Sequence, residues 1–166
     1  MNDWRIVMEP KTKENKLIDI IRMTKAACVI FIALVLAADV FGYIICRYVV
    51  YVWEAQPRIS YDADIAVTTT IFYICTLCVY VLLFSVFRLV NNMSKDIVFD
   101  GRNTKLMGYI SLMLVLIGIF CTAELFFWSG AFFLSVISWF MALIVQCVKV
   151  VFDKAISMKN ELDYTV

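Results

Sequence analysis

Residues 26–51 read AACVIFIALVLAADVFGYIICRYVVY, and Asp39 is the only acidic residue in this run. An α-helix of roughly 20 mainly apolar residues crosses a bilayer core about 30 Å thick. The run exceeds the apolar region of about 7–15 residues in a cleaved signal peptide. Tyr48, Tyr51 and Trp53 at its end are typical of the aromatic belt at a membrane interface. We therefore interpret the run as a retained membrane span.

Three further stretches have the length and composition of membrane spans: residues 65–87, 106–127 and 131–151. The first of these contains no Asp, Glu, Lys or Arg, and the second contains one acid, Glu124. Only residues 128–130 separate the last two stretches, which predicts a tight helical hairpin. The sequence thus predicts an all-α, polytopic membrane protein: a single domain built as a four-transmembrane-helix bundle.

The composition agrees with lipid as the main solvent. Of 166 residues, 63% are hydrophobic and 17% are charged, against roughly 45–50% and about 25% in soluble domains. Disordered chains are poor in apolar residues, so disorder is excluded as well. The net charge of +1 gives no reason to expect nucleic acid as a direct partner. The chain has no His, the commonest general base and metal ligand.

The distribution of Lys and Arg predicts the orientation. Of the 15 such residues, all but Arg47 and Arg58 fall in the N-terminal segment 1–25, in the second connection at about 88–105, or at the C-terminal end. Positive residues favour the cytoplasmic side, so both termini are expected there. The outward connection, at about 52–64, carries three acidic residues and is too short for a folded domain.

The two ends of the chain are expected to lie outside the bilayer core. Within the cytoplasmic or interfacial segment 1–25, Leu17, Ile18 and Ile21 share one helical face, so an amphipathic helix is expected in the headgroup layer before the first span. Residues 152–166 are polar enough to form a cytoplasmic tail.

Asp39 is the first candidate functional residue, because an acid near the middle of a span costs about 2.5–3.5 kcal/mol on insertion scales. Asp39, Tyr43 and Arg47 recur at i, i+4 and i+8 and share one face that leads outward. The carboxyl group either responds to protons or cations, or binds a basic ligand, or fixes helix packing through a hydrogen bond. Thr68–Thr70 or a Tyr hydroxyl would supply that bond.

Glu124, late in the third span, has two interpretations. It is a solvated carboxylate at a helix end, or it joins Arg47 and Asp39 in an outward-facing polar cleft. In the second case, Glu124→Gln and Asp39→Asn would both alter activity.

The six cysteines fall mostly within the spans, where Cys packs as a small apolar residue: Cys28, Cys46, Cys75, Cys78, Cys121 and Cys147. Cys75 and Cys78 form a single CxxC, which is weak evidence for zinc without His or a second pair. Cys46 and Cys121 are the one pair expected to approach each other near the outer face. Without a His to activate a hydroxyl nucleophile, the chain is expected to be no enzyme and to need no cofactor or metal.

Two segments carry a family resemblance. Residues 98–111 read VFDGRNTKLMGYIS and residues 161–166 read ELDYTV. Together they resemble the domain of unknown function 2975 family of small bacterial membrane proteins. In that family a Phe precedes an Asn by four residues, an apolar residue and an Ile open the third helix, and the chain ends in Glu-x-Asp-x-Thr-Ile/Val. The matching residues are Phe99, Asn103, Met107, Ile110, Ser111, Glu161, Asp163, Thr165 and Val166.

The chain departs from the family at a Gly-Pro-like turn, where it has Ile97 and Val98, and at a basic position, where it has Gly108. The resemblance implies four helices in the bacterial cytoplasmic membrane and no established activity. Family genes often adjoin a helix-turn-helix regulator, which implies membrane-linked regulation. On physical grounds, Asp100 or Asn103 is expected to cap the third helix.

Two functional hypotheses follow. In the first, the protein is a membrane-embedded regulatory or interaction protein that senses a lipid, peptide or membrane state and signals to a cytoplasmic partner. In the second, it is a small transporter or channel subunit, or an immunity-type protein, with Asp39 as the intramembrane acid. Four helices are few for a solitary carrier, so the second hypothesis implies a homo-oligomer.

Overall fold

The computed structural model describes residues 4–53, 60–95 and 100–163 and contains four helices in these ranges. They are α1 (Trp4–Trp53), α2 (Tyr61–Met93), α3 (Gly101–Glu124) and α4 (Ala131–Asp163). Each contains a stretch long and apolar enough to cross a membrane. The described part of the chain is all-helical, as the sequence predicts.

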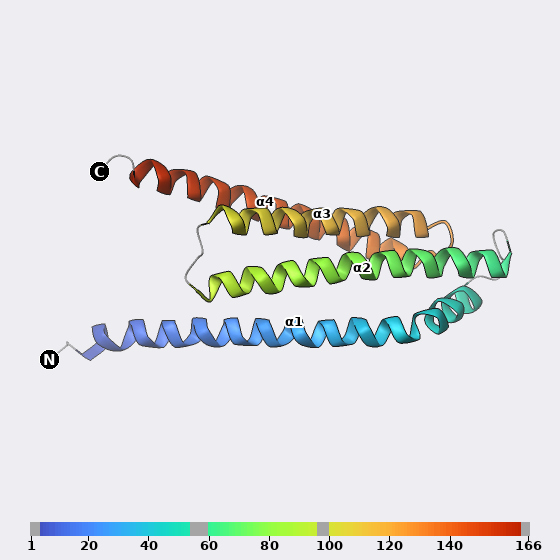
Figure 1. The fold of residues 1–166 in the computed structure, drawn as a ribbon, viewed down its shortest axis with the longest axis horizontal. Coiled ribbons are helices and arrows are strands. Elements are labelled where there is room, and N and C mark those ends of the chain that lie inside the picture. The colour runs from blue at the N-terminus through green and yellow to red at the C-terminus, as the bar shows by residue number, and fades with distance from the viewer. Residues whose placement is uncertain (1–3, 54–59, 96–99, 164–166) are drawn as a thin grey trace.

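Consecutive helices pack against each other: α1 on α2, α2 on α3, and α3 on α4. No other pair of helices packs together among the described residues. The start of α1 and the end of α4 lie at one end of the assembly, together with the end of α2 and the start of α3 (Figure 1). We call this the terminal end. The opposite end, where α1 leads to α2 and α3 turns into α4, is called the connection end.

The helix starts are set by side-chain caps. Ser60 precedes α2, and its hydroxyl accepts a 3.3 Å hydrogen bond from the amide of Ala63. Asp100 precedes α3 and accepts a 3.0 Å bond from the amide of Arg102. Both residues have extended backbones and satisfy amide groups that the first helical turn leaves without partners.

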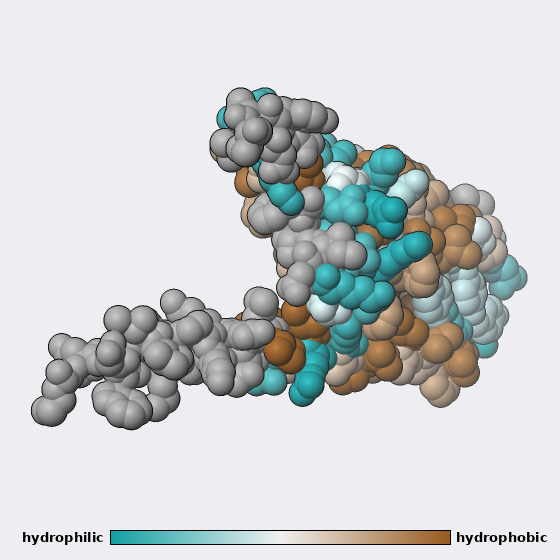
Figure 2. All heavy atoms as spheres, turned by 60° about the vertical axis from the view of Figure 1, so that its left-hand side comes forward, coloured by the Kyte–Doolittle hydropathy of each residue, from teal (hydrophilic) through white to brown (hydrophobic). Residues whose placement is uncertain are grey.

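Small residues line the helix contacts. A Cβ atom on Gly42 would lie 2.7 Å from Cε1 of Phe72, and one on Gly118 would lie 3.1 Å from Nε1 of Trp139. These glycines therefore allow an aromatic ring of the next helix to approach the backbone, as is typical of membrane helices. Most large apolar side chains face outward instead. Figure 2 shows polar residues gathered at the terminal end, with apolar residues beside them.

Helices α2 and α4 extend beyond the expected spans 65–87 and 131–151, and two further boundaries differ from the sequence interpretation. No Gly or Pro occurs between Pro10 and Gly42, and residues 15–25 continue α1 without a break before the first span. At the other boundary, α3 ends at Glu124, three residues before the expected end of its span. The amides of Phe126, Phe127 and Trp128 bond to the carbonyls of Ala123 and Glu124, which closes the turn early.

Candidate functional site

A cavity of about 280 Å³ lies at the connection end. All four helices and the turn between α3 and α4 contribute to its wall, through Ile45, Cys46, Val49, Thr68, Ile71, Phe72, Cys75, Cys121, Glu124, Trp128, Ala131 and Leu134. Most of these side chains are apolar. The cavity is therefore suited to an apolar molecule rather than to a hydrated ion.

Glu124 gives the cavity its one carboxylate. Only 6% of the residue is exposed, and Thr68, from α2, is equally buried. The carbonyl of Glu124 accepts hydrogen bonds of 2.9 and 2.8 Å from the amides of Phe127 and Trp128. This turn directs the chain back so that Trp128 lines the same cavity. Glu124 therefore ends α3 as a buried residue in the cavity wall. The interpretation of Glu124 as a solvated carboxylate is wrong.

Three thiols line the cavity: those of Cys46, Cys75 and Cys121. The side chains of Cys75 and Cys121 lie next to each other in this wall, where α2 packs on α3. All six cysteines are free. Cys46, considered from the sequence as the residue that approaches Cys121, lines the same cavity from α1.

The described residues contain no cluster of three His, Cys, Asp or Glu arranged to hold a metal ion. Cys78 follows Cys75 by three residues on α2 but does not line the cavity. The CxxC motif consequently does not direct both of its thiols into one site.

Asp39 is half-buried and fixes α1 to α2. Its Oδ2 accepts a 2.6 Å hydrogen bond from the hydroxyl of Tyr80, and its backbone carbonyl accepts a 3.2 Å bond from the hydroxyl of Tyr73. A Tyr hydroxyl, one of the two kinds of partner considered from the sequence, therefore holds the carboxyl group.

The expected cleft of Asp39, Arg47 and Glu124 does not form. Tyr43 is 54% exposed, and Arg47 is exposed as well. On this stretch of α1 it is Cys46 that lines the cavity with Glu124. Tyr43 and Arg47 lie on the outer side of α1, because the helical face that packs on α2 passes through Gly42 and Cys46 instead.

Asp64 was not singled out by the sequence reasoning, which placed it in the outward connection. It is fully buried in the first turn of α2. Asp62 and Asp64 form an acidic first turn after the Ser60 cap, where the helix dipole stabilises negative charge. The spacing of four between Asp64 and Thr68, which puts both on one helical face, is the signal that could have revealed it.

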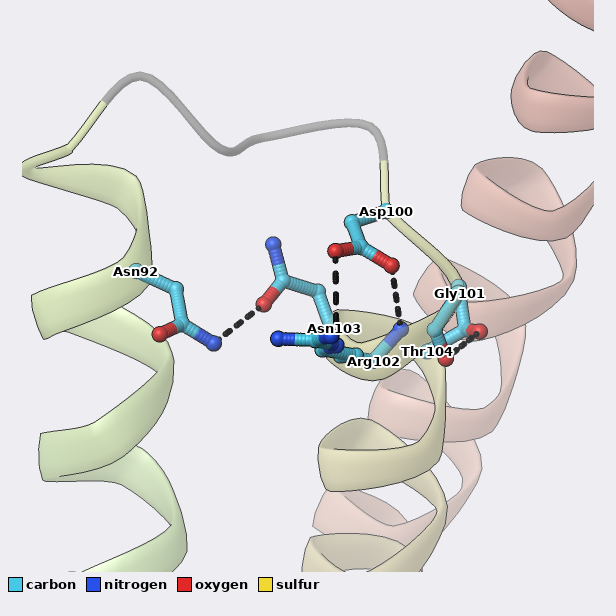
Figure 3. Close-up of polar contacts among 6 residues, drawn as sticks. All are labelled: Asn92, Asp100, Gly101, Arg102, Asn103 and Thr104. Atoms are coloured by element: carbon cyan, nitrogen blue, oxygen red, sulfur yellow. Dashed lines mark hydrogen bonds and ion pairs between the residues drawn. The ribbon is translucent and has the colours of Figure 1, made fainter.

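A polar network connects α1, α2 and α3 at the terminal end. Nζ of Lys25 donates hydrogen bonds of 3.1 Å to Oδ1 of Asn91 and 3.0 Å to the hydroxyl of Ser94. The side-chain amide of Asn92 donates a 2.9 Å bond to Oδ1 of Asn103, which is 1% exposed (Figure 3). Asn103 thus joins α3 to α2.

The remaining motif residues belong mainly to the helix contacts. Met107, Ile110 and Ser111 are buried on α3, and the Ser111 hydroxyl donates a 3.3 Å bond to the carbonyl of Ala142 on α4. Glu161 is exposed, and Asp163 ends α4. Phe99, Thr165 and Val166 lie outside the described residues.

A family model described as "Protein of unknown function (DUF2975)" matches residues 10–166. The chain belongs to the DUF2975 family. This confirms the resemblance drawn from residues 98–111 and 161–166. No curated protein and no solved structure matches this DUF2975 protein. The family has no characterised function, so function here is argued from the cavity and the polar network.

Proposed function

We propose that this DUF2975 protein is a non-enzymatic, membrane-embedded regulatory protein. An apolar ligand, or an apolar segment of a lipid, occupies the cavity at the connection end. When the ligand is bound, the helices at the terminal end change their arrangement. A cytoplasmic partner binds the terminal end and responds to this change. The observation that carries the proposal is that all four helices contribute to the wall of one cavity.

The same helices reach both sites. Thr68 lines the cavity and Asn92 belongs to the terminal-end network, and both lie on the continuous helix α2. At a rise of 1.5 Å per residue, they are separated by about 35 Å. A ligand that alters the packing of α2 on α3 at one end can therefore shift the Asn92–Asn103 contact at the other. Such coupling requires the ligand to bind one arrangement more tightly than the other.

The surroundings of the network suggest which side the partner occupies. Arg22, Lys95, Arg102 and Lys105 are near the terminal end, and the rule that positive residues stay inside favours a cytoplasmic location for it. In the proposed orientation, the protein spans the bacterial cytoplasmic membrane and both termini lie on its cytoplasmic side. A helix-turn-helix regulator, which the family resemblance implies as a gene neighbour, is the proposed partner, and no direct contact of this chain with nucleic acid is proposed.

Quenching of Trp128 fluorescence tests cavity binding. The test uses a variant in which Trp4, Trp53 and Trp139 are replaced by Phe, so that Trp128 is the sole Trp. A brominated alkane is titrated into vesicles of unbrominated phosphatidylcholine that contain this variant. Saturable quenching is expected.

Two matched substitutions on α1 locate the binding. Val49→Phe fills part of the cavity and should weaken binding about tenfold, because overpacking costs about 1–3 kcal/mol. Val40→Phe, at an exposed position, should leave the titration unchanged. If the quenching curves of the two variants were equal, the probe would be in the surrounding lipid, which would contradict the proposal.

A second candidate function is transport, as a small carrier or channel subunit or an immunity-type protein. The observation in its favour is Asp39, whose Oδ1 is buried and has no hydrogen-bond partner among the described residues. Proton or cation flux into liposomes, abolished by Asp39→Asn and accompanied by a homo-oligomer, would favour this function. Absence of flux with intact cavity binding would favour the regulatory one.

A further inference from the structure

Helices α2 and α3 bring two thiols together in the cavity wall. Cys75 and Cys121 both line it from helices that pack on each other, and their side chains lie next to each other. The register of the two helices gives the same result independently. Asn92 bonds to Asn103 at the terminal end, and Cys75 precedes Asn92 by nearly as many residues as Cys121 follows Asn103. In an antiparallel pair of helices, that places the cysteines level with each other.

The other cysteines are placed differently. Cys46 lines the cavity from α1, which does not pack on α3 among the described residues. Cys28 and Cys78 are buried away from the cavity, and Cys147 is exposed on α4. Cys75 and Cys121 are thus the pair of thiols in direct contact on neighbouring helices within the described residues.

The surroundings of the pair allow a small reagent to react with it. The cavity holds about 280 Å³ and has an apolar wall, so a small uncharged molecule fits within it.

We propose that Cys75 and Cys121 form an oxidation site, at which a membrane-permeant peroxide converts the two thiols into a disulfide between α2 and α3. One sulfur attacks an oxygen of hydrogen peroxide, which breaks the O–O bond and gives a sulfenic acid and one water. The second sulfur attacks the first, forms the S–S bond and releases a second water. The two thiols lose two protons and two electrons in total, and one peroxide is reduced to two waters.

The disulfide would fix α2 to α3 within the cavity wall. Reduction by a small thiol would restore the state with free cysteines that the structure shows. The inference requires the contact between the two thiols and does not depend on whether a ligand binds in the cavity. Its failure and that of the proposed function are therefore distinguishable.

Peroxide treatment of the full chain in phosphatidylcholine vesicles tests the proposal. Remaining thiols are alkylated with N-ethylmaleimide after unfolding, and peptides are identified by mass spectrometry without reduction. We expect a peptide that links Cys75 to Cys121 and the loss of two alkylated thiols. Dithiothreitol should restore both thiols.

The controls are matched serine variants. Cys75→Ser should abolish the cross-link and leave Cys121 alkylated or as a sulfenic acid, whereas Cys46→Ser and Cys147→Ser should retain the cross-link. A cross-link in Cys46→Ser and Cys147→Ser would also show that a serine substitution does not by itself disrupt the fold. A dominant link between Cys46 and Cys121, or oxidation of Cys147 alone in the wild-type chain, would overturn the proposal.

Discussion

The hydroxyl of Tyr80 donates a 2.6 Å hydrogen bond to Oδ2 of Asp39. This bond joins α2 to α1 within the apolar part of both helices. A carboxyl group in such surroundings is costly unless it is hydrogen-bonded. The contact therefore accounts for how α1 carries an acid in its span while packing on only one neighbouring helix among the described residues.

Tyr80→Phe should weaken the packing of α1 on α2. Hydrogen bonds between membrane helices average about 0.6 kcal/mol and reach about 1.7 kcal/mol. We expect a loss near the upper value, because the bond is short and its acceptor is a carboxyl group. The free energy of unfolding in mixed micelles, measured by denaturant titration, gives the loss. Tyr43→Phe on the exposed side of α1 is the matched control, and equal losses in the two variants would contradict the role of this bond.

Asn92 and Asn103 should behave as a coupled pair. A double-mutant cycle with Asn92→Ala and Asn103→Ala is expected to give a coupling energy of about 0.6–1.7 kcal/mol in the free energy of unfolding. Asn91→Ala, which removes a bond to Lys25 on α1, should not couple to Asn103→Ala. Additive losses for Asn92 and Asn103 would mean that the 2.9 Å contact does not stabilise the structure.

Asp100 should matter as a helix cap rather than as an ion-pair partner. Asp100→Ala is expected to cost about 1 kcal/mol of folding free energy, whereas Asp100→Asn, which can still cap, should cost less. Arg102 lies 3.8 Å from Asp100 and is largely exposed, so Arg102→Ala should have little effect. Thermal unfolding of the three variants distinguishes the roles. A larger effect of Arg102→Ala than of Asp100→Ala would reverse the assignment.

Gly42→Ala should destabilise the protein although Ala favours helix. The added Cβ would lie 2.7 Å from a ring carbon of Phe72, and overpacking costs about 1–3 kcal/mol. Gly101→Ala, where no atom lies within 4 Å of the added Cβ, should be neutral or stabilising. Melting temperatures in detergent provide the comparison. A stabilised Gly42→Ala variant would show that the α1–α2 contact is looser than the structure indicates.

The four helices could be predicted from the sequence, because long apolar runs have few alternatives in lipid. The position of Asp39 within a span and the cap formed by Asp100 also followed from local patterns. The partners of the polar residues did not, since they depend on helix rotation. A rotation that turns Cys46 inward leaves Tyr43 and Arg47 outside, and the sequence pattern of α1 does not distinguish the two faces.

The cavity could not be predicted from the sequence either, because it also depends on how the helices are rotated. Its wall combines side chains from all four helices, and an apolar wall has no composition that differs from ordinary packing. The burial of Asp64 had a weak signal in its spacing of four from Thr68, but its place beside the first connection led to the prediction of an outward loop.

Hydrogen exchange with mass spectrometry tests most directly whether binding in the cavity changes the terminal end. The full chain in phosphatidylcholine nanodiscs is compared with and without the brominated alkane, alongside Val49→Phe and Val40→Phe. We expect the probe to change exchange in residues 88–95 and 100–105 of the wild-type chain and of Val40→Phe, with a much smaller change in Val49→Phe. A change confined to residues that line the cavity, or the same change in both variants, would contradict the coupling of the two ends.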